Sequence, residues 1–289
     1  MEKGSRMIGV SPAFMVSLYG PGFSIRNFCE GLTLVRKLGF GGYQPEILVG
    51  TALPDWVRDA RSVHLAASDL GLVPTQFVAH FMLEEFSNPG KLNPWSGIDE
   101  LKQVIDILQE FSPCRVLTIP ASTFDVDWDS PGETDFRWWH EVHRRLVEKV
   151  AGYVRVVEEA GLKLAFELLP SSVFGGAARF PALCDEIGSP ALGLNFDTGH
   201  AWACRELVPL LPFELRGKIF GTHLGDNMST ENIKLAPGKG TIPWKPLLAN
   251  LAGSGYDGSW DVEIGCAPDQ VIGEYGFGLN HLQQFGING

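Results

Sequence analysis

Single acidic or histidine side chains close four consecutive apolar runs in the second half of this 289-residue chain. Burying such a group costs several kcal/mol unless it is paired or binds a metal. Three carboxylates at one point repel one another unless a cation lies among them, and an oxygen-rich donor set with one nitrogen suits Mn2+, Co2+, Mg2+ or Zn2+. The pattern predicts one divalent metal ion, with Mn2+ the first choice, held by Glu167 in LAFELLP, Asp197 in LNFDTGH, His223 in IFGTHLGD and Glu263 in WDVEIG.

Eight short apolar runs alternate with amphipathic helical patterns along the chain, as expected for parallel strands joined by crossover helices. The expected strands are residues 7–14, 41–47, 72–81, 114–121, 163–169, 192–199, 218–225 and 259–265. Since no linker or low-complexity tract divides the chain, we predict an α/β fold, a single (β/α)8 TIM barrel over residues 1–289. The carboxyl ends of the strands form one rim of such a barrel, and the metal site is expected there.

Helical patterns follow the strands in turn. The expected helices are residues 24–39, 55–70, 98–111, 136–161, 182–187, 206–215, 244–251 and 269–284. Ser24 can cap the first of them and Gly39 can end it. The main alternative, an open doubly wound sheet, would normally carry a glycine-rich phosphate loop after its first strand, and VSPAF and YGPGFS do not have that spacing.

Composition narrows the function classes. The chain is 45% hydrophobic and 20% charged, which is typical of a soluble globular protein, and its net charge of -11 disfavours a nucleic-acid partner. Five scattered cysteines form no C-x-x-C pair, which indicates reduced thiols in a cytoplasmic protein. We expect no signal peptide, and no membrane partner because no segment approaches about 20 uninterrupted apolar residues.

The ordered set of polar residues resembles the sugar isomerase/epimerase superfamily, the xylose isomerase-like TIM barrels that also include endonuclease IV. The motifs that carry the resemblance are FE, DTGH, HLGDN, PGKGTIPW and VEI. The resemblance implies that Glu167, Asp197, His223 and Glu263 are the ligands of one divalent metal and that His200 contacts substrate. It also implies a small sugar or sugar-like substrate, and a homo-oligomer as one possible assembly.

The endonuclease IV branch of this superfamily needs three zinc ions and an Asp-x-His just before the PGxG segment. Asn232 and Lys234 stand at those positions in ENIKLAPGKG, and the fourth strand closes in LTIPAS without a histidine. His80 and His200 alone cannot supply the missing ligands. The sequence therefore disfavours a phosphodiesterase that repairs DNA.

A single metal beside two glutamates suits proton transfer next to a carbonyl. Glu167 and Glu263 are the expected catalytic pair, one removing a proton from a keto sugar to give an enediolate and the other returning it. Return to the opposite face of the same carbon epimerises the sugar, whereas return to the adjacent carbon isomerises it. A related-barrel dehydratase and a non-catalytic sugar-binding barrel remain as alternatives.

Several further residues have both a functional and a structural interpretation. His80 and Asp226 are candidate substrate-binding residues, although a barrel-end packing role and a loop hydrogen bond suit them equally well. Glu46 is a weaker candidate, and Lys239 is expected to be a solvated loop lysine. The HEVH segment at residues 140–143 lacks the spacing of a zinc protease motif and is expected on the outer face of the longest helix.

Overall fold

The computed structural model describes residues 6–129 and 135–285, and its strands are all parallel. One sheet has the order β3-β2-β1-β9 and the other β4-β5-β6-β7-β8. Isolated bridges from Glu46 to Val78 and from Leu224 to Val262 join the two sheets. The strands are β1 (Ile8–Val10), β2 (Gly42–Tyr43), β3 (Val73–Pro74), β4 (Phe77–Val78), β5 (Val116–Ala121), β6 (Lys163–Leu168), β7 (Leu192–Asp197), β8 (Ile219–His223) and β9 (Trp260–Val262).

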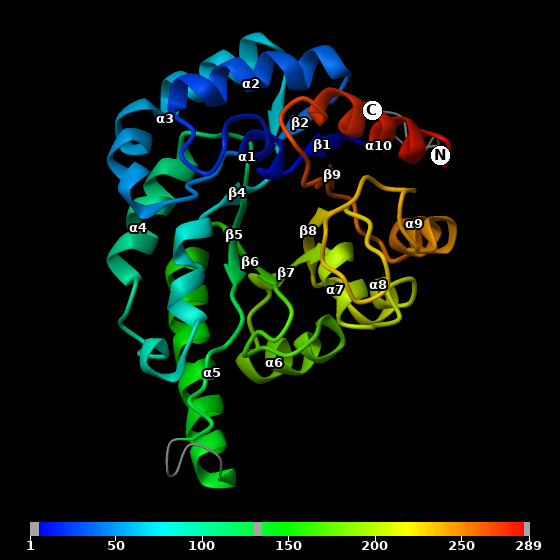
Figure 1. Cartoon of the computed structure of the whole chain (residues 1–289). Helices are drawn as coiled ribbons and strands as arrows, with labels where there is room; N and C mark the ends of the chain where they lie inside the picture. Colours follow the sequence, from blue (N-terminus) through cyan, green and yellow to red (C-terminus); the bar gives the residue numbers. More distant parts are fainter. Residues whose placement is uncertain (1–5, 130–134, 286–289) are drawn as a thin grey trace.

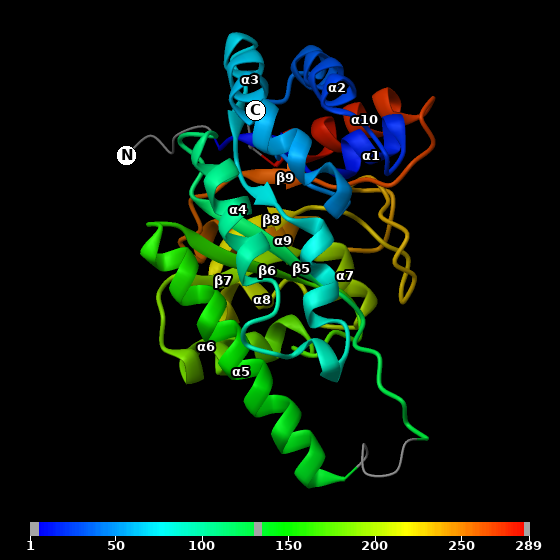
Figure 2. The ribbon, with the colours of Figure 1, turned by 90° about the vertical axis from the view of Figure 1, so that its left-hand side faces the viewer.

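The strands β3 and β4 are two parts of the third expected strand, so the ring has eight positions and the predicted TIM barrel is confirmed. Helices surround the strands, and α5 projects well beyond the barrel (Figures 1 and 2). The helices are α1 (Ala13–Tyr19), α2 (Ile25–Leu38), α3 (Leu53–Asp69), α4 (Ile98–Gln109), α5 (Phe136–Glu159), α6 (Phe180–Ile187), α7 (Thr198–Ala203), α8 (Leu211–Glu214), α9 (Trp244–Gly253) and α10 (Val271–Gln283). Short 3-10 turns are η1 (Gly50–Ala52), η2 (His80–Phe86), η3 (Pro89–Lys91) and η4 (Ala177–Arg179).

The ends of α2 follow the sequence signals. The Ser24 side chain accepts a hydrogen bond from the backbone N–H of Asn27, and the Asn27 side chain accepts one from the backbone N–H of Ser24. Gly39 ends the helix with φ 98°, a left-handed conformation that glycine adopts without a steric penalty. Both predicted ends of this helix are confirmed.

Several expected elements end differently in the structure, and proline contributes to two of these differences. The strand expected over residues 192–199 ends at Asp197, after which α7 begins, and the strand expected over residues 72–81 gives way to η2 at His80. The expected first strand ends early because Pro12, with φ -56° and no backbone N–H, starts α1. The helix expected over residues 206–215 is reduced to α8, because Pro209 and Pro212 interrupt the helical pattern. Glu206 lies outside this helix, and its carboxylate accepts hydrogen bonds from the backbone N–H groups of Ala177 and Ala178.

The described part of the chain contains no helix whose length and apolar character would let it cross a bilayer.

Candidate metal centre

Four buried side chains converge at the carboxyl rim of the second half of the barrel. One ligand atom from each of Glu167, Asp197, His200 and Glu263 lies within 4.8 Å of all the others. Three of them are predicted metal ligands, and His200, the predicted substrate contact, lies among them. The fourth predicted ligand, His223, touches the same carboxylates.

Strand register brings these residues together. Glu167 lies one residue before the end of β6, Asp197 and His223 are the last residues of β7 and β8, and Glu263 directly follows β9. Asp197 pairs with His223 across the β7–β8 ladder. Since the strands are parallel and neighbouring, all four side chains leave the barrel at its carboxyl rim.

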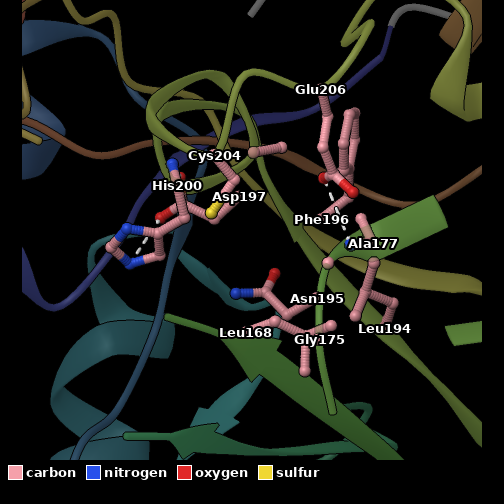
Figure 3. A pocket seen from close by; sticks show the side chains of 12 residues that line it. Leu168, Gly175, Ala177, Leu194, Asn195, Phe196, Asp197, His200, Cys204 and Glu206 are labelled. Atoms are coloured by element: carbon pink, nitrogen blue, oxygen red, sulfur yellow. Dashed lines mark hydrogen bonds and ion pairs between the residues drawn. The ribbon is translucent and has the colours of Figure 1, made fainter. Parts of the chain in front are cut away.

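The two carboxylate oxygens of Asp197 make different contacts. Its Oδ1 accepts the backbone N–H of His200 at 2.8 Å and so caps α7, whereas its Oδ2 lies 3.3 Å from His200 Nε2. The His200 Nε2 is also 3.2 Å from Glu167 Oε1, and its Nδ1 lies 3.2 Å from Asn232 Oδ1. Figure 3 shows His200 beside Asp197, across a small pocket from Glu206.

His223 reaches the same cluster from the other side. Its Nδ1 lies 3.2 Å from Glu167 Oε2 and 3.5 Å from Glu263 Oε1, and its Nε2 lies 2.9 Å from Gln44 Oε1. Among the described residues, His223 Nδ1 and Asp197 Oδ2 are both buried without a well-aligned hydrogen-bond partner. An electron pair on each of these atoms, together with the carboxylates of Glu167 and Glu263, fits a divalent cation.

The charges of the cluster depend on one another. Burial alone would lower the pKa of His223, but the Glu167 and Glu263 carboxylates outweigh burial and raise that pKa to about 10. Burial raises the pKa of Glu263, yet the Lys234 and His223 cations outweigh it and hold the pKa at about 2. Burial also raises the pKa of Asp197 to about 7. The ionisation of each group in the cluster therefore depends on the charges of its neighbours.

A cavity of about 310 Å³ opens beside the cluster. His80, a predicted substrate-binding residue, lines it, and burial lowers the pKa of the imidazole. Glu46 lines it as well, with an Oε2 that has no hydrogen-bond partner among the described residues. Burial, followed by the nearby Glu167 and Glu263 carboxylates, raises the pKa of Glu46 to about 8.

Lys234 is a cavity residue that the sequence analysis did not assign to the site. Its Nζ lies 2.9 Å from Glu263 Oε2, and its backbone has φ 51°. In the sequence this lysine departs from the endonuclease IV pattern just before the PGKG segment, and that departure is the signal that could have identified it.

Asp226 is the predicted substrate-binding residue that the structure places elsewhere. Its fully buried carboxylate accepts the backbone N–H groups of Asn227, Gly238 and Ile242 and the indole N–H of Trp244, at 2.7 to 3.1 Å. Because both oxygens already hold the loop before α9, Asp226 is a loop-organising residue, and it does not line the cavity in the described part of the chain.

The two histidines of the HEVH segment lie on the exposed side of α5, as expected, whereas Val142 between them packs into the core. His143 is half exposed and its Nε2 lies 3.0 Å from Glu186 Oε2. This contact links α5 to α6, and neither residue lines the cavity beside the metal cluster.

The fold and the cluster define a TIM barrel with a buried group of potential metal ligands at its carboxyl rim. The chain belongs to the xylose isomerase-like TIM barrel family, whose model matches residues 32–284. A D-tagatose 3-epimerase-like protein has the same fold, with a TM-score of 0.74 and 17% identity over 97% of this chain and 98% of that one. The zinc-bearing IOLI protein gives a TM-score of 0.73 and 13% identity over 96% and 99% of the two chains.

A fusion of a xylose isomerase-like TIM barrel with 4-hydroxyphenylpyruvate dioxygenase also matches, with a TM-score of 0.72 and 19% identity. The match covers 97% of this chain but 43% of the fusion protein. At these identities the structural matches establish the fold, and the chemistry has to be argued from the site itself.

Proposed function

We propose that this protein is a divalent-metal-dependent isomerase or epimerase of a sugar or sugar-like keto compound. The observation that carries the proposal is the placement of His223 Nδ1, which lies 3.2 Å from Glu167 and 3.5 Å from Glu263 beside a cavity of about 310 Å³. Removal of a proton next to a carbonyl and return of a proton require acid–base groups, and Glu167 and Glu263 can supply them. The epimerase-like protein among the structural matches supports the same class.

We assign the metal to Glu167, Asp197, His223 and Glu263, and substrate contact to His200 and His80. A bound divalent ion would polarise the carbonyl and the neighbouring hydroxyl of the substrate. One of the two glutamates takes the proton from the carbon between these groups and the other returns a proton. The side chains of the cluster are themselves buried, and electrostatic interactions are stronger in such a setting than in water.

Lys234 is proposed to support the same step. The Lys234 ammonium contacts Glu263 at 2.9 Å and lines the cavity. A cation at this place favours the ionised form of Glu263, the form that can accept a proton. It would also stabilise negative charge that develops on substrate oxygens during the reaction.

A deuterium wash-in screen tests the proposal. Purified protein is incubated in D2O with free and phosphorylated ketoses and with Mn2+, Co2+, Mg2+ or Zn2+, and α-deuteration is followed by NMR. We expect metal-dependent exchange with at least one ketose, and a loss of about 100-fold or more in Glu167→Gln and Glu263→Gln. His143→Gln, on the outer face of α5, is the control and should exchange like the wild type.

The division of roles between the two histidines has its own test. His223→Asn should abolish tight metal binding in isothermal titration calorimetry, whereas His200→Asn should keep metal and lose exchange. Equal loss of metal in both variants would make His200 a ligand as well. Absence of exchange in a metal-loaded wild type would favour a dehydratase or a non-catalytic sugar-binding barrel.

A further inference from the structure

We infer that Gln44 and Asp261 are positioning residues that hold His223 in the tautomer whose Nδ1 electron pair faces the metal. The inference deepens the proposed function, because it rests on His223 being a ligand. Neither residue lines the cavity in the described part of the chain, so their action has to pass through the imidazole ring.

The contacts form a chain through the barrel interior. The buried Gln44 follows β2, and its Oε1 lies 2.9 Å from His223 Nε2 at the end of β8. On its other side, the Gln44 Nε2 donates to Asp261 Oδ2 at 2.8 Å, in the middle of β9. Three residues from three strands, all nearly or completely buried, therefore act as one hydrogen-bonded unit.

Asp261 determines which way the Gln44 amide faces. Its Oδ2 also accepts hydrogen bonds from Thr75 Oγ1 at 2.9 Å and from Ser259 Oγ at 2.7 Å. An oxygen that receives three donors requires the NH2 group of Gln44 rather than its carbonyl. The Gln44 carbonyl must then face His223, where only an N–H can satisfy it.

The orientation of the Gln44 amide determines which ring nitrogen of His223 carries the electron pair. With Nε2–H donated to Gln44, a neutral His223 carries its electron pair on Nδ1, the atom that faces Glu167 and Glu263. Ligand histidines are commonly oriented in this way by a partner on their other nitrogen, and loss of such a partner typically weakens metal binding about 10- to 100-fold. The reversed amide would present a donor to Nε2 and place a proton on the metal-facing nitrogen.

The test compares zinc affinity, by calorimetry, in the wild type, in Gln44→Leu and in the double variant Gln44→Glu with Asp261→Asn. Gln44→Leu removes the acceptor and should weaken zinc binding by about 10-fold or more. The double variant exchanges the two functional groups, so the total charge is kept and an acceptor oxygen again faces His223. We expect it to recover most of the affinity.

Gln76→Leu is the matched control. Gln76 is another buried interior amide, but its Nε2 donates to Asn195 Oδ1 at 3.0 Å and Thr118 donates to its Oε1 at 2.6 Å. This variant should lose stability yet keep zinc affinity within about threefold, because Asn195 reaches Glu167 only at 3.4 Å. Nitrogen-15 NMR of the zinc form gives a second readout, in which His223 should carry its proton on Nε2 in the wild type and the double variant.

The possible outcomes distinguish failure of the proposed function from failure of the positioning role of Gln44 and Asp261. If the wild type binds no divalent metal, the proposed metal site fails and the inference falls with it. If the wild type binds zinc and folded Gln44→Leu binds it equally tightly, the proposed function stands and the positioning role is wrong. Should Gln44→Leu fail to fold, Gln44→Met takes its place, and recovery in the double variant still decides the matter.

Discussion

The two halves of the barrel differ in how their strands end. In the second half, the ends of β6 and β7 and the residue after β9 bring Glu167, Asp197 and Glu263 into one cluster, and His223 at the end of β8 contacts two of these carboxylates. In the first half, the ends of the second and third barrel strands deliver Glu46 and His80, which line the cavity without joining that cluster. In the proposed function the second half supplies the metal ligands, whereas residues of both halves line the cavity that would receive the substrate.

Strand length varies around the barrel. The fourth to seventh barrel strands, β5 to β8, have five or six residues and form a continuous ladder, whereas β1 to β4 and β9 have two or three residues. A short ladder supplies few backbone hydrogen bonds, so side chains must hold the first half in place. Lys149 does so, since its Nζ contacts Glu85 Oε2 at 2.7 Å and the backbone oxygens of Glu85 and Lys91 at 2.8 and 2.6 Å.

The largest effect is expected from the second half, in Asp197→Ala. The change removes an oxygen ligand and the cap of α7, which positions His200. Metal affinity measured by calorimetry should fall by more than about 1,000-fold, or about 4 kcal/mol. Asp197→Asn keeps an oxygen that can cap the helix and serves as the control for the fold. Retained affinity in Asp197→Ala would contradict the assignment of this ligand.

In the first half, Lys149→Met should affect stability and leave metal binding intact. The Lys149 side chain is fully buried, and its loss leaves Glu85 without its closest cation and two backbone oxygens without a donor. We expect urea unfolding to show a loss of about 3 kcal/mol. The double variant with Glu85→Leu should recover part of it. A large loss of metal affinity in folded Lys149→Met would mean that the two halves are coupled.

The sequence was most informative where a lone charged or histidine side chain interrupts an apolar run. Glu167, Asp197, His223 and Glu263 could be identified in this way, since burial of each has a cost that demands an explanation. The same signal could have drawn attention to Asp261, but Gln44 is an uncharged amide and could not be identified in this way. Their contact joins residues 217 positions apart, so the sequence could not show that they form a pair. Lys149 lies at a helical spacing from Leu146 and Tyr153 on the buried face of α5, so periodicity could have revealed its burial.

Glu46→Gln tests the first half of the barrel through the pH dependence of its stability. The pKa of Glu46 is raised to about 8 from an ordinary 4.5, so between these values the folded state keeps a proton that the unfolded chain releases. Stability of the wild type should therefore fall as pH rises through this window, and the variant lacks this contribution. In urea unfolding of metal-free protein, we expect Glu46→Gln to gain about 1 to 3 kcal/mol on the wild type between pH 5 and pH 8. Parallel pH profiles would contradict the burial of an unpaired carboxyl.

The smallest effect is expected at Lys239, five residues beyond Lys234. Its Nζ contacts both carboxylate oxygens of Glu274 at 2.7 and 2.8 Å and lies 4.9 Å from the centre of the Phe277 ring. A partly exposed pair of this kind contributes about 0.5 kcal/mol, so Lys239→Ala should match the wild type in metal affinity and in deuterium exchange with free or phosphorylated ketoses. Lys234→Ala should instead slow exchange, because its ammonium faces Glu263 and the cavity. If Lys239→Ala selectively slowed exchange with a phosphorylated ketose, the loop before α9 would have to contribute to substrate binding in addition to the residues that line the cavity.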